Sequence, residues 1–258
     1  MKIFKRIVKV FLWSCLLLVW IFLTAFANSE YGEIVLNKVN IVFIKDNQHH
    51  LITNDEVEDL VKDLGLVEGV SIKKDIHVNQ IEKTLRSHYA VDKAEVYFLN
   101  NGDLHINIFK KTPIARLLGN TSGVNYYLDY NGRLMKTSDS YVAKLPIFSG
   151  EIFSINDEFE PKSSTLIISE IYEMSQLINN DAFLKSQIVQ IHIRNNGYFE
   201  LIPRIGNHKI LFGSPENMEE KLNKIKLFYT KGPDPKELNL YDTLNVMYND
   251  QIVCSKIN

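Results

Sequence analysis

The chain has 258 residues, of which 45% are hydrophobic and 23% charged, a composition typical of a globular protein of one or two domains. The sequence has 29 lysines and arginines and 31 aspartates and glutamates. Residues 1–30 contain four of these cations and one of these acids, so residues 31–258 contain 25 cations and 30 acids and have a net charge of −5. This acidic balance excludes a general nucleic-acid binder, which needs a basic surface. Cys15 lies in an apolar segment and Cys254 near the C-terminus, so we expect no disulfide.

The N-terminal region has the pattern of a membrane anchor. Residues 10–29 contain no charged side chain, and these twenty residues are long enough as a helix to span a bilayer core of about 30 Å. Because cations precede this segment, the positive-inside rule predicts a cytoplasmic stub over 1–9, a single transmembrane helix over 10–29 and an exported remainder. The alternative is a signal peptide cleaved after Ala27, but the apolar run exceeds the about 7–15 residues of a signal-peptide core.

The region 34–111 predicts a small α+β domain. A capping box, in which Thr53 and Glu56 each accept from the other's backbone amide, begins a helix that Gly65 ends. Asn100-Asn101-Gly102 predicts a hairpin turn between two later strands. The expected elements are a strand over 35–44, helices over 53–65 and 79–87, and strands over 91–99 and 104–109.

After Pro113 the sequence predicts a mixed α/β region built on antiparallel strands. Ser214 and Pro215 have the types favoured at the N-cap and the first position of a helix. Two Asn-Gly pairs predict hairpin turns, at Asn131-Gly132 and Asn196-Gly197. The other expected elements are strands within 126–135 and 187–202, a helix over 161–180, a strand over 209–212 and a mostly extended segment over 238–254.

An ordered series of short motifs runs along the exported part of the chain. It includes Val39-Asn40-Ile41, Thr53-Asn54-Asp55-Glu56-Val57, Gly69-Val70-Ser71-Ile72, Val91-Asp92-Lys93-Ala94-Glu95-Val96, Thr112-Pro113-Ile114-Ala115-Arg116, Tyr127-Leu128-Asp129, Leu145-Pro146-Ile147 and Tyr248-Asn249-Asp250-Gln251-Ile252-Val253. In this order they resemble the FtsQ/DivIB family of bacterial cell-division proteins. The resemblance implies a POTRA-type domain over 34–111 and an FtsQ-like β-domain over 112–258 that ends in a partner-binding strand.

The resemblance also implies a function and a location. It implies a non-enzymatic scaffold of the cell-division machinery, held by one span in the bacterial inner membrane with its folded domains in the periplasm, and enriched at the division septum. The implied partners are FtsB/DivIC-like and FtsL-like bitopic division proteins. Through them the scaffold would help to recruit and regulate a septal peptidoglycan synthase.

The closing segment is the candidate partner-binding element. If it forms a sheet edge, its free amides and carbonyls can add a strand of a partner. The candidate contact residues are Leu244, Val246, Tyr248, Asp250 and Ile252, with the amphipathic Tyr248 as the expected hot spot. The alternative is that this strand is covered and its apolar side chains belong to the core.

No pattern of residues predicts catalysis, a cofactor or a metal ion. The histidines lack metal-site spacing, and the sequence contains no nucleophile elbow, P-loop or dinucleotide fingerprint. We therefore expect that the protein is not an enzyme and that it binds no cofactor and no metal ion. Two other functions stay open: an export or outer-membrane assembly factor, which would need several POTRA repeats or a barrel, and a secreted hydrolase released by cleavage after Ala27, which would need a convergent catalytic set.

Overall fold

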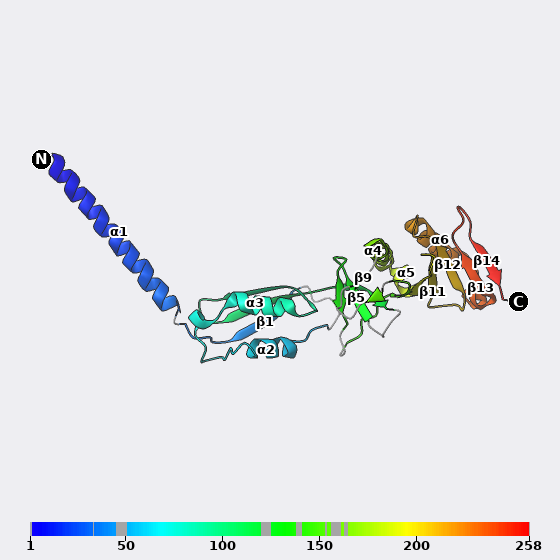
Figure 1. The fold of residues 1–258 in the computed structure, drawn as a ribbon, viewed down its shortest axis with the longest axis horizontal. Coiled ribbons are helices and arrows are strands. Elements are labelled where there is room, and N and C mark those ends of the chain that lie inside the picture. The colour runs from blue at the N-terminus through cyan, green and yellow to red at the C-terminus, as the bar shows by residue number, and fades with distance from the viewer. Residues whose placement is uncertain are drawn as a thin grey trace. The chain divides into compact units, whose positions relative to one another are not determined.

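The chain folds into two compact units, Met1–Lys110 and Lys111–Asn258, each of which combines helices with a sheet (Figure 1). This arrangement, taken from a computed structural model, confirms the predicted α+β class. The structure describes residues 2–32, 34–44, 51–119, 125–137, 141–152, 154–155, 161–162 and 165–257.

The first element is the long helix α1, Lys2–Gly32. Its large apolar side chains between Phe11 and Leu23 are exposed, among them those of Trp13 and Trp20. No helix in the described part of the chain combines the length and the apolarity needed to cross a membrane. The membrane anchor over 10–29 stays a prediction.

The rest of the first unit packs two helices against a three-stranded sheet. Its elements are β1 (Val39–Ile44), α2 (Asn54–Lys62), the short 3-10 helix η1 (Lys73–Asp75), α3 (Val78–Ser87), β2 (Val91–Phe98) and β3 (Leu104–Lys110). The strand order is β1-β3-β2, with β1 parallel and β2 antiparallel to the central β3. Side chains that are fully or nearly fully buried form its core, including Val57, Ile81, Leu85, Leu104, Ile106 and Ile108.

Local signals position two of these elements. The predicted capping box is confirmed, because Glu56 N–H donates to Thr53 Oγ1 at 3.3 Å and Thr53 N–H donates to Glu56 Oε2 at 2.8 Å. The turn before β3 contains Gly102 with φ +87°, and a Cβ there would lie 2.6 Å from the carbonyl oxygen of Val35. The turn therefore requires glycine for both its conformation and its close approach to Val35.

The second unit is built on a nine-stranded mixed sheet of order β14-β13-β12-β11-β10-β7-β4-β5-β6. Its strands in chain order are β4 (Pro113–Leu118), β5 (Asn125–Asp129), β6 (Leu134–Lys136), β7 (Ile147–Gly150), β10 (Ile188–Ile193), β11 (Phe199–Pro203), β12 (Lys209–Gly213), β13 (Tyr241–Asn245) and β14 (Val253–Lys256). Three pairs, β4–β7, β7–β10 and β12–β13, are parallel, so the sheet is less uniformly antiparallel than the turns predict.

Three helices cover one face of this sheet: α4 (Thr165–Asn180), α5 (Ala182–Gln187) and α6 (Met218–Lys231) (Figure 1). The shared core contains Phe148, Ile171, Met174, Ile191, Leu201, Phe212, Leu222 and Ile225.

Two predicted helix starts are wrong. Residues 161–162 form a short strand, β9 (Pro161–Lys162), with β8 (Ser154–Ile155), so the helix begins at Thr165. The last helix begins at Met218 rather than at Ser214, because Asn217 adopts a left-handed turn before it.

Candidate partner-binding edge

The predicted closing segment forms a hairpin rather than one extended strand. The 3-10 helix η2 (Pro235–Leu240) leads into β13, and the chain then turns back to form β14. The turn is local in origin, because Asn245 Oδ1 accepts from Met247 N–H at 3.0 Å and Asp250 has φ +56°. Asn and Asp are the residue types that tolerate both features. The expectation of a mostly extended segment over 238–254 is therefore wrong, because the segment begins in η2 and turns back between β13 and β14.

β14 is the last strand of the sheet and has an open outer side. Ile257 N–H donates to the Leu240 carbonyl at 2.9 Å, which directs the backbone of Ile257 toward the β13 side. Successive residues of an antiparallel strand direct their backbone N–H and C=O groups alternately toward and away from the neighbouring strand. The N–H and C=O groups of Lys256 and Cys254 therefore point away from β13. Among the described residues, no strand pairs with this outer side. The sheet therefore ends in outward backbone donors and acceptors.

The five candidate contact residues divide into a buried and an exposed set. Leu244 and Val246 are 0% exposed and belong to the core of the second unit, so they present no side chain to a partner. Tyr248 is 49% exposed and Asp250 is also exposed, both in the turn between the strands. Ile252 is half-buried against the core. The hairpin thus exposes Tyr248 and Asp250 in its turn and buries Leu244 and Val246 in the core.

Sequence reasoning missed the apolar side chains of β14 itself. Val253 is 45% exposed and Ile257, which follows the strand, is 57% exposed. They alternate with Cys254, which packs against the core and whose burial raises the pKa of its thiol. The signal was present as a period-two pattern from 253 to 257, but it is short and contains only two apolar residues on the exposed face.

Helix α6 holds the turn of the hairpin. Lys224 Nζ donates to the Tyr248 carbonyl oxygen at 2.8 Å and also pairs with Glu220 at 3.0 Å. The rings of Phe228 and Tyr241 meet edge to face at 5.9 Å between their centroids, which ties β13 to the same helix. Helix α6 therefore holds the turn at Tyr248 and the start of β13 at Tyr241.

A buried polar pair lies beneath the base of the hairpin. His208 is 1% exposed, and its Nε2 lies 2.6 Å from the hydroxyl oxygen of Tyr229 on α6. Burial lowers the pKa of His208 and raises the pKa of Tyr229 to about 12. Both groups are therefore neutral near neutral pH, and we interpret their contact as a structural hydrogen bond rather than as an acid–base pair.

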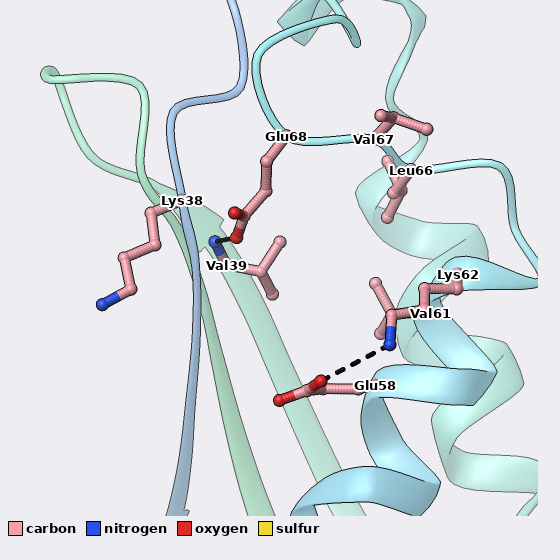
Figure 2. Close-up of a pocket in the computed structure, with 8 residues that line it drawn as sticks. All are labelled: Lys38, Val39, Glu58, Val61, Lys62, Leu66, Val67 and Glu68. Atoms are coloured by element: carbon pink, nitrogen blue, oxygen red, sulfur yellow. Dashed lines mark hydrogen bonds and ion pairs between the residues drawn. The ribbon is translucent and has the colours of Figure 1, made fainter.

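The first unit has an edge of its own, beside a pocket of about 560 Å³ between β1 and α2 (Figure 2). Figure 2 shows Glu68 reaching β1, where its carboxylate accepts from Val39 N–H at 2.8 Å. On the opposite wall Glu58 pairs with Lys62 at 3.5 Å, beside the apolar Val61. The pocket therefore borders a strand edge whose first outward amide already has an acceptor.

Within the residues covered by the structure, no three histidine, cysteine or acidic side chains converge as metal ligands would.

Comparison with known proteins gives two family matches. The model of a POTRA-like domain matches residues 35–109, and the model described as "FtsQ/DivIB, C-terminal related" matches residues 112–255. A search of curated protein sequences found no match. Both matched families are non-catalytic scaffolds. The second match covers more than half of the sequence and coincides with the nine-stranded unit, so the chain belongs to the FtsQ/DivIB family.

Proposed function

We propose that this protein is a membrane-anchored scaffold of the cell-division machinery that captures small bitopic division proteins by adding one of their segments to β14. The observation that carries the proposal is the open outer side of β14, with the backbone groups of Cys254 and Lys256 directed outward. Strand addition of this kind obtains affinity from main-chain hydrogen bonds and specificity from alternate side chains. Val253 and Ile257 would supply apolar contacts, and Tyr248 an amphipathic one.

The division of labour along the chain follows from this proposal. The stub 1–9 stays in the cytoplasm and the span 10–29 holds the protein in the inner membrane, a role supported by the uncharged sequence and by the exposed apolar side chains of α1. The POTRA-type domain, 34–111, provides a further docking surface. The β-domain, 112–258, binds FtsB/DivIC-like and FtsL-like partners at the septum. The assembled complex helps to recruit and regulate a septal peptidoglycan synthase.

Photo-crosslinking in intact cells tests the proposal. A photoreactive amino acid is placed at Val253 in the full-length protein, and the adducts are identified by mass spectrometry. The matched control carries the same amino acid at Lys231, an exposed position on α6. We expect small single-span division proteins in adducts from position 253 and not from position 231. Adducts with outer-membrane barrels or their chaperones, or no difference between the two positions, would contradict the proposal.

A further inference from the structure

The second unit contains a pocket of about 440 Å³ that is separate from the β14 edge. It lies at β4, β7 and the start of β10, so β11, β12 and β13 stand between it and β14 in the sheet. The loop that forms one wall is held in place by two hydrogen bonds. Ala143 N–H donates to Tyr127 Oη at 3.0 Å, and Arg116 N–H donates to the Pro146 carbonyl at 3.0 Å. Hydrogen bonds within the protein therefore fix this wall of the pocket.

Four cationic side chains line this pocket: Arg116 on β4, Lys144 in the loop, Lys185 on α5 and Arg204 after β11. In the described part of the chain no carboxylate pairs with any of them, although the other arginines and several lysines of this unit do form ion pairs. The Nε of Arg204 donates only to a backbone carbonyl, that of Ser186 at 2.7 Å. In an exported region of net charge −5, this is a local excess of positive charge.

Arg116 shows that the described residues do not balance this excess. Its side chain is half-buried, and its Nε is fully buried without a hydrogen-bond acceptor. Buried N–H groups almost always have a partner in native structures. A guanidinium also presents its donors in a planar fork that suits a carboxylate or a phosphate. The described residues place no carboxylate on this guanidinium, so an anionic ligand in the pocket would be its counter-ion.

The apolar walls distinguish between anionic ligands. Val142, Ile147 and Val189 lie beside the four cations, so the pocket offers contacts to aliphatic groups as well as to acids. A lone phosphate or sulfate has no group to place against them. We propose that this pocket binds an acidic peptide segment of another protein, in which aspartate or glutamate alternates with aliphatic residues. The inference goes beyond strand capture at β14 and does not depend on it.

The test uses the full-length protein in detergent and a fluorescent short peptide in which glutamates flank two leucines. The control peptide has glutamine in place of each glutamate. Anisotropy titrations should show at least about tenfold tighter binding of the glutamate peptide, and its affinity should fall as salt is added, because the attraction is electrostatic. Equal binding of the two peptides would overturn the proposal.

Charge reversal then locates the site. The double variant Lys185→Glu/Arg204→Glu changes two exposed side chains and should weaken binding of the glutamate peptide at least about tenfold. The control Lys83→Glu/Lys231→Glu makes the same charge change on exposed side chains of α3 and α6, and should change the affinity less than about twofold. Equal effects of the two double variants would overturn the assignment.

A third arm distinguishes a peptide from a phosphate-bearing ligand. Inorganic phosphate and phosphatidylglycerol vesicles are titrated against the same proteins. We expect both to bind more weakly than the glutamate peptide. Tighter binding of either one, lost in Lys185→Glu/Arg204→Glu, would assign the pocket to a phosphoryl group and would overturn the peptide proposal.

Discussion

The edges at β1 and β14 differ in what occupies their outward backbone groups. At β1 the Val39 amide, which faces away from the sheet, is bound by the Glu68 carboxylate at 2.8 Å. At β14 the corresponding groups of Cys254 and Lys256 face outward with no strand of the described chain beside them. Proteins commonly protect their edges against unwanted pairing. The comparison supports the proposal of strand addition at β14, whereas at β1 the protein's own side chain already occupies the first outward amide.

The largest expected effect concerns the part of the β14 hairpin that is core rather than edge. Leu244→Ala removes a fully buried side chain and should lower the free energy of unfolding by about 2–5 kcal/mol. Chemical denaturation of the full-length protein measures this loss. The matched change Val253→Ala removes a half-exposed side chain and should cost less than about 1 kcal/mol. A small effect of Leu244→Ala would mean that the hairpin is not packed on α6.

The pair beneath the hairpin should make stability depend on pH. The pKa of His208 is lowered from 6.5 in the folded state, so the unfolded chain binds a proton more readily. Stability is therefore constant with respect to this group above about pH 6.5 and falls as the pH drops below that value. Denaturation between pH 7.5 and 5 should show the decline, and His208→Gln, which can still bond to Tyr229, should reduce its slope. An unchanged slope would show that another group is responsible.

A smaller effect is expected where Glu68 protects β1. Glu68→Ala leaves the Val39 amide without its acceptor and should cost about 1 kcal/mol in unfolding free energy. It should also open the β1 edge and increase self-association in sedimentation experiments. The control Glu58→Ala removes a carboxylate from the same pocket without touching β1. If both variants behave alike, the hydrogen bond from Val39 does not protect the edge.

The smallest effect on stability is expected at Tyr248. Tyr248→Glu replaces a side chain that is 49% exposed, so the melting temperature should change little. Recovery of bitopic partners should nevertheless fall, because a charge replaces an amphipathic contact beside the open edge. Co-purification followed by quantitative mass spectrometry measures the recovery. Unchanged recovery with an unchanged melt would exclude Tyr248 from the interface.

Local chemistry made parts of the fold predictable. The capping box at Thr53 depends on residues three apart, and the Asn-Gly turns depend on neighbours, so both could be predicted from the sequence. The start of α6 could not, because Ser214 and Pro215 suit a helix but the left-handed turn at Asn217 postpones it to Met218.

The candidate site was predictable only in its place along the chain. Leu244, Val246 and Tyr248 share one period-two pattern, and this pattern continues through the turn after Asn245 and so conceals it. Burial by α6 then separates the core residues from the exposed ones. The cationic pocket had no local signal, because its four cations come from segments that lie between residues 116 and 204. Such groupings are set by tertiary structure alone.

A single proline substitution tests most directly whether β14 captures partners by strand addition. Lys256→Pro removes an amide that faces away from β13, so the pairing with β13 should survive while one hydrogen bond to a partner strand is lost. Lys256→Ala keeps the amide and is the matched control. We predict that Lys256→Pro lowers recovery of bitopic division proteins about tenfold with an unchanged melting temperature, and that Lys256→Ala does not. Full recovery with folded Lys256→Pro would contradict strand addition at β14.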